Sequence, residues 1–305
     1  MAMDENEIKP DFVPGSDPLS RGCRVGLAFS GGAARSLAHI GVLKALAEAG
    51  IPVDAIAGTS GGAVMAVLFA AGIPLEEIEA RAIALRRRDL GRITLSRMGL
   101  ISIRPLQNIL ESMTGPIQLE TLRIPTAVVA TNLIRRERHV FRTGDAIRSA
   151  LASSAMPHVY RPVEINGELF TDGGVVEYLP VSALEPYRPL VRVAVHLLPE
   201  DQYRSRPRHL GQVMATIVNI VQRGNAGPSA KQTDVLIRPA VAPFPPFDLV
   251  NGAELVDCGY HAARRAVPQI VRLLEERERW LGELGQGLGD RRVQDDRRAA
   301  DSSSS

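Results

Sequence analysis

Near its start the chain twice shows the same pattern, in which an apolar run meets glycines and a helical segment follows. Arg24–Ser30 is short and apolar and ends at Gly31-Gly32, and Val53–Ala57 ends at a second cluster of glycines. Apolar runs of this length without alternation are typical of strands that are buried on both faces. Strand, helix and strand in short order favour parallel β-α-β units. We therefore expect an α/β protein with a mainly parallel central sheet.

The segments that follow the glycines have the features of helices. In Ser36–Ala49 the apolar residues recur at helical spacing, and Gly50 and Pro52 end the pattern. Ala63–Ala71 contains only apolar residues and is closed by Gly72. The second segment is therefore expected to be a buried helix.

The alternation of strands and helices continues along the chain. Asn166-Gly167 lies between two short strand-like runs and is a strong signal for a two-residue hairpin turn. Because no internal repeat and no linker is visible, residues 22–284 are expected to form one three-layer α/β/α domain. Further strands are expected at Pro125–Thr131, His139–Arg142, Val163–Ile165, Glu168–Thr171, Val191–Leu198 and Asp234–Arg238, and further helices at Ala146–Ala155, His209–Gln222, Gly252–Ala263 and Val267–Leu281.

The two ends of the chain differ from this domain in composition. Residues 1–21 begin with acidic residues and are rich in Pro, Gly, Asp and Ser, so they are expected to be a flexible leader and not a secretory signal. Residues 285–305 are rich in Gly, Arg, Asp and Ser and are expected to be a disordered tail.

One uncharged stretch, between Asp54 and Glu76, is long enough to be tested as a membrane-spanning helix. Several glycines and Pro74 interrupt it. A buried strand, a tight turn and a buried helix therefore explain it better than a span does.

Charge and composition exclude several classes of function. Lys and Arg number 36 against 34 Asp and Glu, for a formal net charge of +2, and aromatic residues make up 4%. This balance gives no electrostatic reason to expect a nucleic-acid partner. Two cysteines exclude a disulfide scaffold and fit a cytoplasmic location, and no Cys/His cluster has the spacing of a zinc site. The sequence gives no indication of the oligomeric state.

Gly58-Thr-Ser60-Gly61-Gly62 matches G-x-S-x-G, the pattern of a nucleophile elbow. Glycines on both sides allow a strained turn from strand to helix, which projects the serine hydroxyl away from the backbone. An apolar strand precedes Ser60 and an apolar helix follows it, as an elbow requires. The alternative is a glycine-rich turn that is needed only for close packing of strand and helix.

A second glycine loop, Ser30–Arg35, also lies between a strand and a helix. Backbone N–H groups at such a position favour negative charge, so the loop is suited to a tetrahedral oxyanion or to a phosphate. No G-K-[ST] follows and G-x-G-x-x-G does not fit, which argues against a nucleotide. A plain tight turn is the remaining alternative.

Thr171-Asp172-Gly173-Gly174 is the third candidate motif. An aspartate followed by two glycines after a strand is usually a turn. The functional interpretation is that Asp172, placed at a strand end, accepts the proton of Ser60.

These three sets of residues, in this order, resemble the patatin-like phospholipase family. The family's pattern is a G-G-G-x-R-G loop, then G-x-S-x-G, then D-G-[GA]; this chain has Gly31–Ser36, Gly58–Gly62 and Asp172–Gly174 in those places. The likeness covers most of Val25–Val181 and continues more weakly to about Ala263. The combination is far more specific than any single motif.

The resemblance implies a patatin-like fold and a hydrolase of lipid acyl esters that works with a Ser–Asp dyad. Ser60 would attack the ester carbonyl and form an acyl-enzyme, Asp172 would be the general base, and water would release the fatty acid. No metal and no organic cofactor is implied. The expected partner is a lipid or fatty-acyl ester substrate, with transient contact to a membrane surface. The backbone groups expected to hold the oxyanion are those of Gly31, Gly32 and Ala33, with Arg35 close by.

The chain departs from the family pattern in the glycine loop, where Ala33 stands for the third glycine and Ser36 for the glycine after the arginine. An alanine keeps its N–H, so the oxyanion site is intact if Ala33 has a negative φ and is strained or reshaped at a positive φ. A weakly active or catalytically silent lipid-binding member of the fold is therefore an alternative. Glu177-Tyr178 also stands where the family often has Asn-Pro.

A Ser-His-Asp α/β-hydrolase is a further alternative. Its chain order requires a histidine after the acid, so His196, His209 or His261 would be the base. Against this, Ser60 follows only the second strand, and lone histidines are more often structural or exposed.

Two segments are candidates for contact with lipid. Arg86–Arg88 and the arginines after it alternate with apolar residues, which would suit an anionic lipid surface, although a charge run is more often a solvated helix end. Phe244–Phe247 is a candidate for the mouth of an acyl pocket, with local packing as the alternative.

Overall fold

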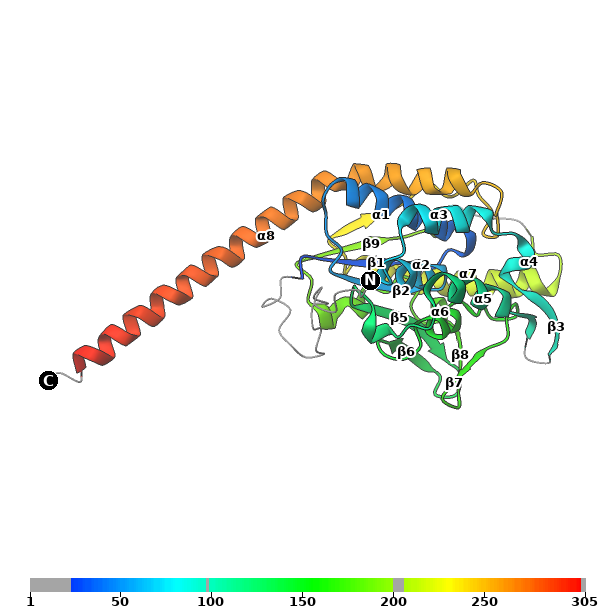
Figure 1. Ribbon diagram of the computed structural model, residues 1–305, viewed down its shortest axis with the longest axis horizontal. Coiled ribbons are helices and arrows are strands. Elements are labelled where there is room, and N and C mark those ends of the chain that lie inside the picture. The colour runs from blue at the N-terminus through cyan, green and yellow to red at the C-terminus, as the bar shows by residue number, and fades with distance from the viewer. Residues whose placement is uncertain (1–22, 97–98, 200–205, 303–305) are drawn as a thin grey trace, which may run out of the picture.

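The computed structural model describes residues 23–96, 99–199 and 206–302, and it has helices on both sides of a central sheet (Figure 1). Its strands are β1 (Val25–Phe29), β2 (Ala55–Thr59), β3 (Arg92–Ser96), β4 (Gly99–Ser102), β5 (Thr126–Asn132), β6 (Glu137–Phe141), β7 (Val163–Ile165), β8 (Glu168–Asp172), β9 (Val191–Val195) and β10 (Val235–Ile237). Its α-helices are α1 (Ala38–Glu48), α2 (Gly61–Ala70), α3 (Leu75–Ala84), α4 (Arg87–Leu90), α5 (Arg104–Thr114), α6 (Ala146–Ser154), α7 (Leu210–Ala230) and α8 (Gly252–Ser302). Short 3-10 helices are η2 (Ala33–Leu37), η3 (Leu119–Thr121), η4 (Gly173–Val175) and η5 (Ser182–Tyr187).

The central sheet has eight strands in the order β10-β9-β1-β2-β5-β8-β7, with β6 paired to β5 outside this path. The strands from β10 to β5 run parallel to one another. β6 and β8 are antiparallel to β5, and β7 is antiparallel to β8. The predicted three-layer fold with a mainly parallel sheet is therefore confirmed.

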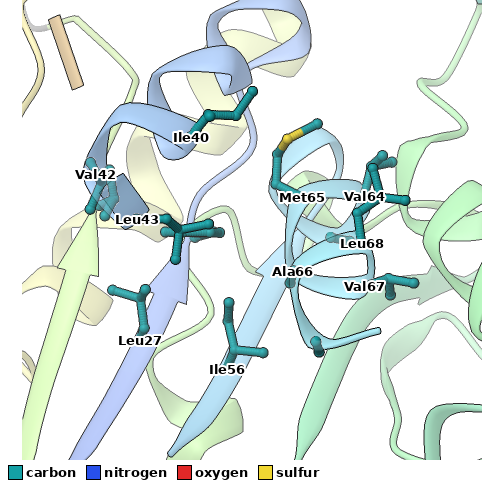
Figure 2. Packing of buried hydrophobic residues seen from close by; sticks show 14 of the residues in the cluster. Leu27, Ile40, Val42, Leu43, Ile56, Val64, Met65, Ala66, Val67 and Leu68 are labelled. Atoms are coloured by element: carbon teal, nitrogen blue, oxygen red, sulfur yellow. The ribbon is translucent and has the colours of Figure 1, made fainter. Parts of the chain in front are cut away.

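The two faces of the sheet carry side chains of different size. Leu27 and Ile56 point to the face that is covered by α1, α2, α6 and α8, where they join the larger core (Figure 2). Ala28 and Ala57 point to the other face, which η5 covers. Successive residues of a strand point to opposite faces of the sheet. Large residues that alternate with alanine therefore give a thick layer of side chains on the first face and a thin layer on the second.

β5 has three neighbours, and two of them share one of its edges. β6 pairs with the last five residues of β5 and occupies one edge. β2 pairs with the first four residues and β8 with the last three, so β2 and β8 follow each other along the opposite edge. Thr59, the last residue of β2, pairs with Val129, and Asp172, the last residue of β8, pairs with Ala130. The ends of β2 and β8 therefore face each other.

α1 and α8 pack with their backbones in close contact. A Cβ on Gly41 of α1 would overlap the carbonyl of Val256, and a Cβ on Gly259 of α8 would overlap the carbonyl of Ala38. Both positions therefore require glycine at this helix crossing.

α8 differs from the sequence prediction of two helices and a disordered tail. One helix runs from Gly252 to Ser302 with Pro268 inside it, and its last part extends away from the rest of the fold (Figure 1). Extension of an existing helix adds hydrogen bonds without the cost of a new nucleus, and residues 285–302 contain no proline. The predicted leader, residues 1–21, lies outside the described residues.

The segment from Leu75 to Thr114 contains elements that the sequence did not indicate, α3 to α5 and the antiparallel pair β3–β4. The arginine-rich part is a single turn of helix followed by this hairpin, and not the solvated end of a longer helix. Within residues 23–96, 99–199 and 206–302, no helix has the length and apolarity that a membrane span requires. The uncharged stretch after Asp54 forms β2, a turn and α2, as expected.

Candidate active site

Ser60 lies in the turn between β2 and α2 and has φ 54° and ψ −130°. A φ in the left-handed region costs a non-glycine residue about 1–2 kcal/mol, so it persists only where the surroundings hold it. The Ser60 N–H donates to Ser153 Oγ at 2.8 Å, and Ser153 Oγ donates to the carbonyl of Val129 on β5 at 2.5 Å. Ser60 thus has the strained strand-to-helix conformation of a nucleophile elbow.

The glycines around Ser60 allow α2 to approach β2 and the first glycine loop. A Cβ on Gly58 would lie 2.5 Å from Ala63 Cα, and a Cβ on Gly62 would lie 2.5 Å from the carbonyl oxygen of Ser30. A Cβ on Gly61 would overlap Ser36 Oγ. Both explanations of this motif therefore apply: the glycines allow the strand and the helix to pack closely, and Ser60 has the elbow conformation.

Asp172 is buried at the end of β8, where its two carboxylate oxygens have different partners. Oδ2 accepts the hydroxyl of Ser60 at 2.7 Å, and Oδ1 accepts the N–H of Gly174 at 2.7 Å. A Cβ on Gly173 would overlap the carbonyl of Val129, so this turn can follow the carboxylate only with glycine there. The shared edge of β5 thus brings Ser60 and Asp172 together from positions 112 residues apart.

Burial raises the pKa of Asp172 from 3.8 to about 6, while the hydrogen bonds from Ser60 and Gly174 lower it. Burial acts in this direction because it disfavours the charged form. Above about pH 6 the carboxylate is ionised and can accept a proton from the hydroxyl that it contacts.

The glycine loop offers two free N–H groups rather than three. The Gly31 N–H donates to the carbonyl of Tyr178 at 3.2 Å, and the Ala34 N–H donates to the carbonyl of Pro246 at 2.8 Å. Within the described part of the chain, the N–H groups of Gly32 and Ala33 have no acceptor. The N–H of Gly31, which is also predicted to be an oxyanion donor, is thus already bonded in this conformation.

Ala33 has φ 50°, the positive value at which the sequence predicts strain. Its N–H is nevertheless unbonded within the described residues, and Ala33 lines the same cavity as Ser60. The alanine therefore strains the loop but keeps an N–H donor that has no acceptor among the described residues.

Arg35 is buried, and its Nε and Nη2 donate to the carbonyl of Phe244 at 2.8 and 2.5 Å. Together with the bond from Ala34 to Pro246, this ties the glycine loop to residues 244–247. Phe247, at the end of that segment, lines the cavity beside Ser60. These contacts give Arg35 a structural role, in which it fixes one wall of the site.

Tyr178 is a residue of the site that the sequence analysis missed. Its hydroxyl donates to the carbonyl of Gly31 at 2.5 Å, so both polar groups of the Gly31 residue are bonded to Tyr178. The Tyr178 N–H donates to Asn225 Oδ1 at 2.8 Å, and Asn225 Nδ2 donates to the carbonyl of Gly174 at 2.9 Å. The only signal in the sequence was that Glu177-Tyr178 departs from the family pattern. A buried tyrosine hydroxyl usually finds a hydrogen-bond partner.

The three histidines proposed as alternative bases have other positions. His209 accepts the Gln212 N–H at the start of α7, His261 stacks edge-on against Tyr260 on α8, and His196 stacks edge-on against Tyr178. A hydroxyl has one proton to donate, and Ser60 donates it to the carboxylate of Asp172. In this conformation Ser60 therefore cannot donate the same proton to a histidine.

A mostly apolar cavity of about 100 Å³ adjoins Ser60. Its walls come from η2, α2, α5, the end of α6 and residues 247–249. A wider groove of about 700 Å³ lies next to it and shares Leu85, Phe247 and Leu249. Phe247 thus lies at the junction of the two. Apolar residues that line the cavity include Leu37, Val64, Met65, Leu90, Ile103, Leu106 and Met156.

Similar sequences occur in proteins that are longer than this chain. An uncharacterized NTE family protein of Mycobacterium tuberculosis is 36% identical over 177 residues, which is 57% of this chain and 49% of that protein. Lysophospholipase NTE1 of Yarrowia lipolytica is 32% identical over 187 residues, 58% of this chain and 13% of that protein. The chain therefore spans half or less of the length of these curated relatives.

Two solved structures with low sequence identity also match. VipD from Legionella pneumophila has a TM-score of 0.48 and 14% identity, with 84% of this chain and 67% of that chain covered. Human GIVD cytosolic phospholipase A2 has a TM-score of 0.42 and 13% identity, with 85% and 60% covered. The family model for patatin-like phospholipase matches residues 27–185, just over half of the chain and all three motifs. The protein belongs to the patatin-like phospholipase family.

Proposed function

We propose that the protein is a lipid acyl hydrolase in which Ser60 is the nucleophile and Asp172 the general base. The observation that carries this proposal is the 2.7 Å hydrogen bond from Ser60 Oγ to Asp172 Oδ2, in a serine held in the elbow conformation. A nucleophilic serine needs a base within hydrogen-bond reach, and here a carboxylate occupies the place that a histidine has in a triad.

The reaction proceeds through an acyl-enzyme. Asp172 takes the proton of Ser60 while Oγ attacks the ester carbonyl carbon, and the carbonyl oxygen becomes an oxyanion. Collapse of this intermediate breaks the bond to the alcohol, which leaves with the proton from Asp172. Asp172 then takes a proton from a water molecule that attacks the acyl-enzyme. The bond between the acyl carbon and Ser60 Oγ breaks, Oγ takes the proton back from Asp172, and the fatty acid is released.

The N–H groups of Gly32 and Ala33 would hold the oxyanion. They are the two groups of the glycine loop without an acceptor among the described residues. Preorganised N–H donors of this kind stabilise the charge that develops in the transition state. The strain at Ala33 is the observation that favours the alternative of a weakly active member of the family.

The substrate class follows from the cavity beside Ser60, whose mostly apolar lining suits a fatty-acyl chain. The curated relative named a lysophospholipase supports the same class.

Hydrolysis of p-nitrophenyl acyl esters of increasing chain length tests the proposal. We expect activity in the wild type, a loss of at least 1000-fold in Ser60→Ala and Asp172→Asn, and little change in His196→Ala, because the dyad needs no histidine. Loss of activity in His196→Ala would favour a triad. An inactive wild type that is folded, and also inactive on phospholipid and lysophospholipid, would favour the silent lipid-binding alternative.

A further inference from the structure

One face of α7 presents large apolar side chains to solvent. Spacings of three and four residues place such side chains along one side of a helix. In a surface helix of a globular protein this side normally packs on the core. We call this set the outer face of α7, and its members are between 39% and 76% exposed: Leu210, Val213, Ile217, Ile220 and Val221.

The opposite side of α7 attaches the helix to the rest of the fold. Its buried residues are Ala226 and Ser229, and Asn225, on the flank between the two sides, bonds the η4 turn that follows Asp172. At 100° per residue, Ala226 lies almost opposite the centre of the outer face. The orientation of α7 is therefore set by contacts near the proposed active site, and the outer face points away from them.

The charged residues of α7 and of the segments at its two ends have one sign. From Arg206 to Lys231 the chain has four Lys or Arg residues and no Asp or Glu. Arg206 and Arg208 are exposed immediately before the helix. An apolar helix face flanked by cations fits an anionic lipid surface. A symmetric contact between two copies of this face would instead bring like charges together.

We propose that the outer face of α7 docks on an anionic lipid surface. Figure 1 shows α7 at the end of the molecule toward which the parallel strands point, which is the end where Ser60 follows β2. The inference goes beyond the proposed function, because it concerns binding and not hydrolysis.

Sedimentation with vesicles tests the docking surface in the full chain. Ser60→Ala serves as the background, so that lipid is not consumed. We expect it to sediment with vesicles of 3:1 phosphatidylcholine and phosphatidylglycerol, more weakly with phosphatidylcholine alone, and less at high salt. Adding Ile217→Glu and Ile220→Glu should lower the partition coefficient at least tenfold. Both side chains are exposed, so the fold should be kept, and circular dichroism checks this.

Trp280→Glu is the matched control, because it also replaces an exposed apolar side chain by a charge. Trp280 lies two residues after Glu278, and Glu278 pairs with Arg24 at the amino end of β1. This is the end of the sheet opposite Ser60. We expect its partition coefficient to be unchanged. Equal sedimentation of the α7 variant and the background would overturn the proposal. A dimer that the α7 variant dissociates in gel filtration would also overturn it, in favour of an interface between copies. Hydrolysis of soluble esters by the wild type is measured separately and tests only the proposed function.

Discussion

Ala33 has a backbone conformation that glycine adopts without strain, and the family pattern has glycine at this position. The φ of 50° places its Cβ close to the backbone, at a cost of about 1 kcal/mol. The neighbouring Ala34 belongs to the same 3-10 helix but is not among the residues with positive φ. The two alanines therefore differ in what a change to glycine would do.

Ala33→Gly should raise the free energy of unfolding by about 0.5–1 kcal/mol, since relief of strain outweighs the added freedom of the unfolded chain. The N–H donor is kept, so kcat should not fall. Ala34→Gly should instead lower the free energy of unfolding by about 1 kcal/mol. Urea unfolding monitored by circular dichroism measures both. Equal destabilisation by the two changes would contradict the strain at Ala33.

Asp172 is the residue at which stability and the proposed chemistry oppose each other. Its pKa is raised to about 6 in the folded protein, against about 4 in an unfolded chain. Between these values the folded state binds more protons than the unfolded state, so stability falls as pH rises from about 4 to 6.

Asp172→Asn should remove this fall in stability. At pH 7.5 the variant should be more stable than the wild type by about 1–3 kcal/mol, and below pH 4 the difference should vanish. Urea unfolding at several pH values measures the effect. A variant that is less stable than the wild type at pH 7.5 would show that the burial cost of the carboxylate is smaller than the bonds that hold it.

At the scale of elements, the crossing of α1 and α8 depends on two glycines. Gly259 contacts the backbone of α1 at Ala38, whereas Gly282, later on the same helix, has nothing near the position of a Cβ. Comparison of alanine substitutions at Gly259 and Gly282 therefore separates the effect of a methyl group on packing from its effect on helix propensity.

Gly259→Ala should destabilise the protein by about 2–4 kcal/mol, because α8 must move away from α1 and the core beneath both helices opens. Gly282→Ala should be neutral or stabilising by up to about 1 kcal/mol, because alanine favours the helix. Thermal unfolding compares the two variants directly. A Gly259→Ala protein as stable as Gly282→Ala would contradict the close crossing.

At the scale of the whole molecule, the features that could be predicted from the sequence are those that depend on residues close together in the chain. The strand, glycine turn and helix around Ser60 follow from local periodicity and from glycine chemistry, and so does the Asn166-Gly167 turn, where both residues have positive φ. The proximity of Asp172 to Ser60 was expected from the interpretation of Asp172 as a base at a strand end and from the family resemblance.

Long-range pairing could not be read from local patterns. Two strands share one edge of β5, and nothing in the composition of β2 or β8 indicates this. The bonded N–H of Gly31 depends on Tyr178, which lies 147 residues away. β3 and β4 are short and lie in a segment rich in arginine, so the charge pattern concealed them.

The central claim is that Asp172 activates Ser60 directly, and covalent labelling with a long-chain alkyl fluorophosphonate tests it most directly. We predict one adduct per chain, located on Ser60 by peptide mass spectrometry and absent in Ser60→Ala. The labelling rate should rise with pH through about 6, as Asp172 ionises, and should fall at least 100-fold in Asp172→Asn. Labelling at another residue, or an unchanged rate in Asp172→Asn, would contradict the account.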